Sequence, residues 1–186
     1  MKPLGILIFG PPASGKGTQG ELLSDNSELY HFSTGDMFRT LKEKNDLNRL
    51  EQGILDTMTI DDGNYVSDKQ TMNLFKQRIG ELKKSKLLLD GIPRTLAQVE
   101  VLNKLINVQA LLYIQAPEKE LIKRSLKRGR IDDTEGIIKK RLQIYKEHTH
   151  PILEKYSEKI ITINGNQAQE EVQQEIEDKL KDSKLL

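Results

Sequence analysis

The chain contains no cysteine and no tryptophan, and only 5% of its 186 residues are aromatic. Without cysteine there is no disulfide and no thiolate zinc site, so the sequence excludes a disulfide-stabilised scaffold and a structural zinc of that kind. The absence of cysteine also fits a reducing compartment, and we expect a cytoplasmic protein. The apolar residues are largely Leu and Ile, which predicts an aliphatic core.

An excess of charge of one sign is also missing, because 29 basic residues stand against 28 acidic ones. A net charge of +1 excludes a whole-surface attraction to nucleic acid or membrane, so we expect neither partner. The apolar run at residues 4–9 is too short for a transmembrane helix or a signal-peptide core. The length fits one domain over residues 1–186, which we expect to be monomeric.

Short apolar runs alternate along the chain with stretches of helical spacing. The runs, expected as strands, are residues 4–9, 29–32 (the weakest), 86–90, 110–114 and 160–163. The expected helices are 16–24, 34–44, 68–83, 95–106, 117–126, 134–156 and 167–180. This alternation predicts an α/β fold with a parallel sheet covered by helices on both faces. Residues 45–67 lengthen one crossover, and residues 127–134 form a short charged loop.

The first strand leads into the segment GPPASGKGT, residues 10–18, and a helix is expected to follow. That context predicts a phosphate-binding loop, because small residues let successive backbone N–H groups wrap around a phosphate at a helix N-terminus. Lys16 would add a positive charge between the phosphates, and Thr18 a hydroxyl near magnesium. A Gly/Pro-rich turn without a ligand is the alternative, and the flanking strand and helix argue against it.

Gly17 separates Lys16 from Thr18, whereas the generic loop has Ser or Thr directly after the Lys. In this detail GKGTQ (15–19) resembles the adenylate kinase family, which phosphorylates AMP from ATP with magnesium. Four further segments match in the family's order: FSTGDMFR (32–39), LDGIPRT (89–95) with Gln98, Arg124 with RGRIDD (128–133), and KRL (140–142) with NG (164–165). The resemblance implies a three-layer P-loop NTPase fold with a five-stranded parallel sheet of order 2-3-1-4-5. It also implies an AMP-binding helical insert near 33–66 and a very short lid near 127–134.

The resemblance also assigns roles to individual residues. ATP would be bound by Ala13, Ser14, Gly15, Lys16, Gly17, Thr18, Arg124, Arg128, Gly165 and Gln167. AMP would be bound by Thr34, Arg39, Asn64, Tyr65, Val66, Gly91, Ile92, Pro93, Arg94, Gln98, Arg130 and Arg141. The catalytic set would be Lys16, Arg94, Arg128, Arg130 and Arg141. Asp90 would order water around Mg²⁺, the cofactor brought with ATP, with Thr18 as a possible second contact; ATP, AMP and ADP are the implied partners.

The chemistry of phosphoryl transfer independently calls for such residues. Two nucleotides bring roughly six negative charges into one cleft, and seven cations stand at the matched positions. Arg suits this task because its fork pairs with phosphate oxygens, and no side-chain nucleophile or obligatory base is needed. Each helical Arg has an ordinary alternative as a solvated side chain. Asp132 and Asp133 are expected to cap the helix beginning near Thr134, and also to contact the lid.

Four departures from the family pattern stand out. Ala13 occupies a usual Gly position, which is acceptable if the backbone there needs no positive φ. Ile92 replaces the usual Phe, and the sequence NGNQ (164–167) replaces the usual adenine-side loop. Only Gly129 separates the two lid arginines, so the lid should shield the site less completely and allow some ATP hydrolysis.

Two other functions remain open at this point. A UMP/CMP kinase of the same superfamily is the nearer one, although Thr34, Asp36 and Thr95 are the adenylate-type choices around the acceptor. A non-catalytic nucleotide-binding module is the other, and the retention of every matched cation argues against it. A P-loop GTPase or nucleic-acid switch lacks both a base-specificity motif and a basic face.

Overall fold

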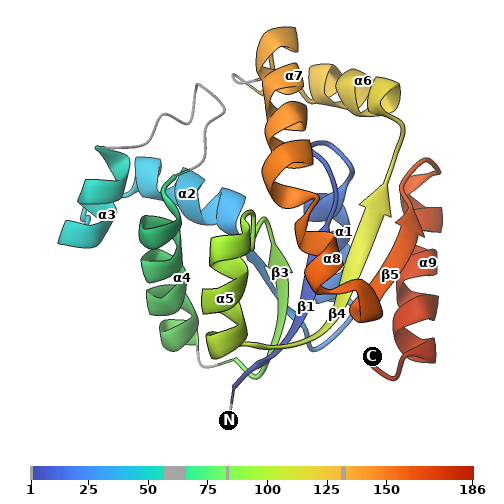
Figure 1. Ribbon diagram of the computed structural model, residues 1–186, viewed down its shortest axis with the longest axis horizontal. Helices are drawn as coiled ribbons and strands as arrows, with labels where there is room; N and C mark the ends of the chain where they lie inside the picture. The colour runs from blue at the N-terminus through green and yellow to red at the C-terminus, as the bar shows by residue number, and fades with distance from the viewer. Residues whose placement is uncertain (1, 57–65, 83, 131–132) are drawn as a thin grey trace.

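The computed structural model describes residues 2–56, 66–82, 84–130 and 133–186. Five parallel strands form one sheet, in the order β2-β3-β1-β4-β5 (Figure 1). They are β1 (Leu4–Phe9), β2 (Tyr30–Ser33), β3 (Lys86–Asp90), β4 (Asn107–Gln115) and β5 (Ile160–Asn164). The α/β class expected from the alternation and the strand order 2-3-1-4-5 implied by the family resemblance are therefore confirmed.

Nine α-helices connect and cover these strands in the described ranges. They are α1 (Lys16–Asp25), α2 (Thr34–Glu43), α3 (Arg49–Leu55), α4 (Asp68–Leu82), α5 (Leu96–Leu105), α6 (Glu118–Arg128), α7 (Glu135–Ile144), α8 (Ile152–Lys155) and α9 (Gln169–Asp182). None of these helices is both long and apolar enough to cross a bilayer. A short 3-10 turn, Ser157–Lys159, precedes β5.

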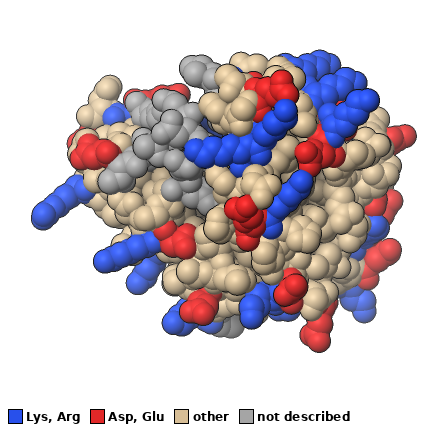
Figure 2. Space-filling view, turned by 45° about the horizontal axis from the view of Figure 1, so that its top comes forward, with Lys and Arg blue, Asp and Glu red and all other residues tan. Residues whose placement is uncertain are grey.

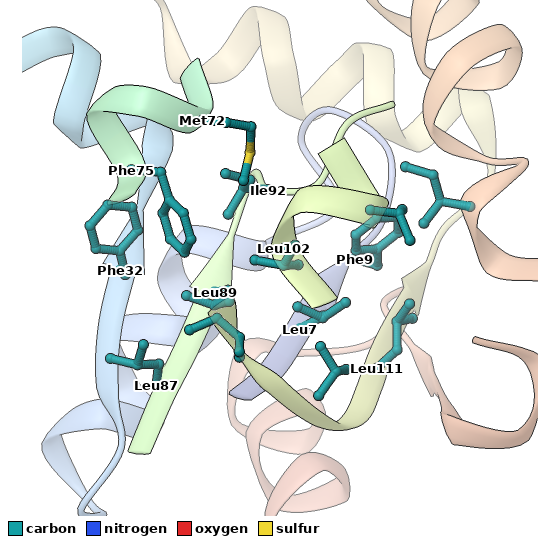
Figure 3. Packing of buried hydrophobic residues seen from close by; sticks show 14 of the residues in the cluster. Leu7, Phe9, Phe32, Met72, Phe75, Leu87, Leu89, Ile92, Leu102 and Leu111 are labelled. Atoms are coloured by element: carbon teal, nitrogen blue, oxygen red, sulfur yellow. The ribbon is translucent and has the colours of Figure 1, made fainter. Parts of the chain in front are cut away.

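The sheet is buried on both faces because alternate residues of its strands point to opposite sides. Leu7, Leu89 and Leu111 belong to the core that also contains residues of α4, α5 and α8 (Figure 3). Ile8 and Leu88 belong to the core on the opposite face, which α1 and α9 cover. A smaller apolar cluster joins α6 to α7 above the sheet. The helices thus form two outer layers around the sheet.

Parallel pairing brings the carboxyl ends of the central strands to one edge of the sheet. Ile8 and Ser33 both stand opposite Asp90 in the register, and Phe9 stands opposite Tyr113. The loops that follow β1 and β3 and the start of α2, which follows β2, therefore emerge side by side. In an open parallel sheet this edge is where ligands bind.

The expected single helix over residues 134–156 is wrong. α7 ends at Ile144, a π-helical turn covers Tyr145–Thr149, and α8 begins only at Ile152. Pro151 explains the break, since its ring lacks an N–H and would clash with the carbonyl of Glu147 in a continuous α-helix. The backbone N–H of His150 instead donates to the carbonyl of Tyr145, five residues back, at 2.8 Å.

Two other boundaries differ from expectation. The loop expected at 127–134 begins later, because α6 continues through Arg128 and ends on Gly129, whose φ of 67° suits the left-handed position after a helix. β4 begins three residues before the expected run 110–114. Its first part alternates polar Asn107 and Gln109 with buried Val108, so a search for continuous apolar residues misses it.

Candidate active site

A cleft of about 470 Å³ opens at the carboxyl edge of the sheet. Its walls come from four parts of the chain: the loop after β1, the start of α2, the loop after β3, and helices α6 and α7 with the residues that follow each. Basic side chains gather on this side of the molecule, mostly over α6 and α7 (Figure 2). The expected cations that line the cleft are Lys16, Arg39, Arg94, Arg124, Arg128, Arg130 and Arg141.

Lys16 opens helix α1 and folds back over its own loop. Its ammonium donates to the carbonyls of Gly10 and Pro11 at 2.8 and 2.9 Å. Burial lowers the pKa of Lys16 from 10.5 to about 8; the nearby arginines lower it further, and Asp90 partly offsets them. The loop therefore holds a desolvated cation that an anionic ligand would stabilise.

The loop conformation depends on residues that tolerate positive φ. Gly10 has a φ of 151°, and a Cβ there would lie 2.4 Å from the carbonyl oxygen of Ile114. Alanine was expected to be acceptable at position 13 if the backbone there needed no positive φ. Ala13 has a φ of 64°, so that expectation is wrong. The alanine is strained, because the left-handed region brings Cβ too close to the following carbonyl.

Arg39 of α2 and Arg94, which follows β3, both line the cleft. Arg39 is ion-paired with Asp36 one turn earlier in α2. Arg94 is held at several points: its Nε donates to the carbonyl of Gly91 at 2.8 Å, and its own carbonyl accepts from the hydroxyl of Thr149 at 3.0 Å. The π-helical turn thereby anchors the arginine that follows β3.

Three of the expected AMP contacts lie beneath the cleft surface. Thr34 is 1% exposed and its hydroxyl donates to the carbonyl of Asp90 at 3.2 Å. Gln98 is 2% exposed and is bonded to Arg94 and Asp68. Ile92 is fully buried in the core. Gly91 and Pro93 line the cleft, Val66 packs against the core, and Asn64 and Tyr65 lie outside the described residues.

The lid arginines converge on one buried carboxylate. Asp133 accepts two hydrogen bonds from Arg128, at 2.6 and 2.9 Å, and one from the backbone N–H of Arg130 at 3.1 Å; Arg141 lies 3.7 Å away. Burial alone would raise the pKa of Asp133, but these partners hold it below its ordinary value. The lid contact expected of Asp133 is confirmed.

The capping role expected of Asp133 is wrong. Thr134 caps α7, its hydroxyl accepting from the backbone N–H of Ile137 at 3.4 Å. Asp132 lies outside the described residues. Thr134 is the capping residue because it stands at the N-cap position itself, while the carboxylate of Asp133 binds the arginines.

Arg124 ties α6 to the loop after β5. Its guanidinium donates to the carbonyl of Gly165 at 2.8 Å and to Glu120 at 3.1 Å. Gly165 is required there, because a Cβ would lie 2.6 Å from Ile114. The amide of Gln167 donates to Glu175 on α9 at 2.7 Å, so its side chain supports the loop from the helix side.

Asp90 ends β3 and lies close to the end of the loop that follows β1, where α1 begins. A Cβ on Gly17 would lie 3.8 Å from its carboxylate, and Thr18 lines the same cleft. In the described ranges no three acidic or histidine side chains form a metal-binding group. One carboxylate and one hydroxyl fit Mg²⁺, which takes few protein ligands and keeps several waters.

Several cleft residues were not expected from the sequence. Tyr145 and Thr149 line the cleft from the π-helical turn, and Glu21 lines it from α1. Tyr145 stands four residues after Arg141, a helical spacing that could have identified it as a neighbour. Thr149 could not have been found this way, since the change to π geometry alters which residues share a face.

Comparison with known proteins agrees with this geometry. The sequence model described as adenylate kinase matches residues 8–161. The chain belongs to the adenylate kinase family. It is 37% identical to adenylate kinase 1 of Nostoc sp. over 180 residues, covering 92% of this chain and 95% of that protein. It is 37% identical to an adenylate kinase of Cyanothece sp., covering 97% and 98%, and 40% identical to one of Prochlorococcus marinus, covering 81% and 82%.

Family membership explains the composition of the cleft. The motif segments that resemble adenylate kinases are the segments that the fold brings to one edge of the sheet. Adenylate kinases are phosphotransferases that use Mg²⁺ with ATP. The comparisons favour neither the pyrimidine kinase nor the non-catalytic alternative.

Proposed function

We propose that the protein catalyses the reversible, Mg²⁺-dependent transfer of the terminal phosphoryl group of ATP to AMP, giving two ADP. The observation that carries this proposal is the convergence of Lys16 and six arginines on one cleft. These cations come from segments as far apart as residues 16 and 141, and a purely structural role would not gather them. Charge of that density matches two nucleotides bound with their phosphates facing.

The donor triphosphate would occupy the loop after β1. Backbone N–H groups of residues 13–18 and the N-terminus of α1 would surround its phosphates, with Lys16 leaving its carbonyl partners to pair with them. Arg124 and Arg128 would attend the same phosphates from α6. The backbone of Gly165 would border the donor base, and Gln167 would support the loop after β5 that contains Gly165.

The acceptor would lie between α2 and the loop after β3. Arg39 and Arg94 would hold its phosphate, and Thr34, Gln98 and the segment at residues 64–66 would face its base. In the reaction an oxygen of the AMP phosphate attacks the terminal phosphorus of ATP, and the bond from that phosphorus to the bridging oxygen breaks. ADP leaves on the donor side with the electron pair of the broken bond.

Arg130 and Arg141 would bridge the transferred group as negative charge shifts across it. Asp90 would hold water molecules of the hydrated Mg²⁺, and Thr18 would lie beside them. When bound, Mg²⁺ supplies charge neutralisation on the donor phosphates. The protein groups provide alignment and electrostatics, and none of them forms a covalent bond to the substrate.

Two parts of the single domain are proposed to move over the bound nucleotides: the insert near 33–66 and the lid near 127–134. Closure would exclude water and bring the arginines onto the phosphates. We further propose a monomer that acts on nucleotides alone, without nucleic acid. Small-angle scattering of the free and nucleotide-bound protein tests both the mass and the closure; a dimer mass, or identical curves, would contradict this paragraph.

The activity itself is tested by a coupled assay of ADP formation with AMP and MgATP. Lys16→Ala should remove turnover and leave the fold intact. An unchanged kcat in that variant would contradict the proposed donor site. A wild-type protein that binds ATP and forms no ADP with AMP would overturn the proposal as a whole.

A further inference from the structure

We propose that Asp68 is a positioning residue for the acceptor base, and that its carboxylate sets the preference for a 6-aminopurine over a 6-oxopurine monophosphate. It would act by fixing the side-chain amide of Gln98 in one orientation. The inference rests on the proposed function, because it concerns the base of the same acceptor. Asp68 lies in none of the segments that carry the family resemblance.

The contacts form a closed set at the start of two helices. Asp68 is the first residue of α4, and its two carboxylate oxygens accept from the Gln98 amide and the Thr95 hydroxyl, both at 2.7 Å. The Gln98 carbonyl oxygen accepts from the backbone N–H of Arg94, also at 2.7 Å. Gln98 is 2% exposed, so these bonds are made away from competing water.

Together these two bonds fix the orientation of the Gln98 amide, because each bond can form with only one of its two ends. An ionised carboxylate only accepts, so the NH₂ group of Gln98 must face Asp68. A backbone N–H only donates, so the carbonyl oxygen of Gln98 must face Arg94. A flipped amide would bring two donors together at one side and two acceptors at the other, with both pairs buried.

The fixed amide retains one hydrogen and one lone pair for a ligand. Adenine offers an acceptor at N1 beside a donor at its 6-amino group, which this amide can match in one orientation. A 6-oxopurine such as hypoxanthine offers the reverse, a donor at N1 beside an acceptor at O6, and would need the flipped amide. Rejection of the wrong base therefore depends on how firmly the amide is held.

The sequence position of Asp68 supports the same role. It follows Val66, the last residue of the 64–66 segment proposed to contact AMP, by two residues. Its carboxylate joins the start of α4 to the segment that contains Thr95 and Gln98. A purely structural role would be to stabilise the first turn of α4, where an acid is favourable; that role predicts no change in base preference.

The test compares wild type, Asp68→Ala and Asp68→Asn, with AMP and inosine monophosphate as acceptors. Asp68→Ala should raise KM for AMP about tenfold, the effect of one lost hydrogen bond, while leaving KM for ATP unchanged. The ratio of kcat/KM for AMP to that for inosine monophosphate should fall by about the same factor. Asp68→Asn keeps an acceptor oxygen for Gln98 and should retain most of the ratio.

Asp178→Ala is the control, because it removes a Gln–Asp hydrogen bond of 2.8 Å, from Gln174 to Asp178, that is exposed on α9. It should leave both acceptor constants unchanged. Melting temperatures of all variants separate positioning from stability. If Asp68→Ala does not fold, Asp68→Ser makes the comparison, since serine still suits the start of a helix but does not reach Gln98.

The outcomes distinguish the inference from the function on which it rests. A wild type that does not phosphorylate AMP refutes the proposed function before any variant is examined. A wild type that prefers AMP, with Asp68→Ala keeping both the base ratio and KM for AMP, refutes the inference alone. An equal loss with both acceptors, accompanied by a lower melting temperature, also refutes it and assigns Asp68 a structural role.

Discussion

The carboxylate of Asp133 holds the guanidinium of Arg128 through two hydrogen bonds, from Nη2 at 2.6 Å and from Nε at 2.9 Å. The carboxylate is 1% exposed, while Arg128 remains partly open to the cleft. This pair fixes the end of α6 close to the start of α7, and it holds Arg128 in the lining of the cleft. Its strength should be visible in the stability of the protein.

Asp133→Asn should lower the free energy of unfolding by about 2 kcal/mol at pH 7, the usual value for hydrogen bonds to a charged group. The folded-state pKa of Asp133 lies below its ordinary 3.8, so its stabilising effect is complete above that pH and is lost as pH falls through the folded-state value. Denaturant titrations of both proteins at pH 7 and pH 3 measure the difference.

The difference between the two proteins should therefore be smaller at pH 3 than at pH 7. Glu135→Gln is the control, because the exposed Glu135–Lys139 pair should contribute almost nothing. A difference that grows on acidification would contradict the assignment.

Lys16 should take up a proton when ATP binds. Its pKa in the free protein is about 8, below the ordinary 10.5, and phosphate groups would raise it again. At pH 9 the free protein has largely lost this proton, so calorimetry in buffers of different ionisation enthalpy should detect uptake at pH 9 and little at pH 6.5. Lys16→Arg is the control, since arginine stays charged throughout; equal uptake in that variant would rule out Lys16 as the source.

The same pKa has a consequence for stability. Between about pH 8 and 10.5 the unfolded chain keeps the Lys16 proton and the folded protein does not. By linkage, this group makes the folded state more stable as pH rises through that window. The burial of the charged form therefore costs most at neutral pH, where a bound phosphate would offset it.

Ala13→Gly should stabilise the protein. Alanine at a φ of 64° is strained, and relief of that strain, less the added freedom of glycine in the unfolded chain, should amount to about 1 kcal/mol. Chemical denaturation measures the gain. Ala97→Gly, in the exposed helical part of α5, should show the opposite sign and lower stability; a destabilised Ala13→Gly would show that the alanine is not strained.

Arg94→Ala should reduce kcat by about 100-fold or more, since it removes the guanidinium that is proposed to hold the acceptor phosphate. Circular dichroism should remain unchanged, because the side chain borders the cleft and does not form part of the apolar core. Lys104→Ala, near the end of α5, provides a matched loss of charge and should retain full activity. Near-normal turnover of Arg94→Ala would contradict the acceptor site.

Much of the architecture could be predicted from the sequence because its signals are local. The apolar runs at β1 and β3 and the start of α1 at Lys16 agree with the structure residue for residue. β2 is displaced by one residue from its expected position. Buried parallel strands are recognised by continuous apolar residues. The expected bounds of β4 were wrong because buried and more exposed residues alternate at its ends.

The failures in the site concern backbone geometry and long-range contacts. The π-helical turn before Pro151 places Thr149 against Arg94, and a 3.6-residue period cannot show that contact. The positive φ of Ala13 depends on how the loop turns between β1 and α1. Asp68 contacts Thr95 and Gln98, which come 27 and 30 residues later in the chain, and nothing in the local sequence predicted those contacts. For Asp133 the sequence predicted a lid contact, but it also predicted a capping role that Thr134 takes instead.

AMP is the acceptor that we expect the protein to prefer. The most direct measurement is kcat/KM with AMP, CMP, UMP and GMP at fixed MgATP, following ADP production. We expect the highest value for AMP, with Lys16→Ala inactive toward every acceptor. A higher value for CMP or UMP, or ATP binding without transfer to any acceptor, would contradict it.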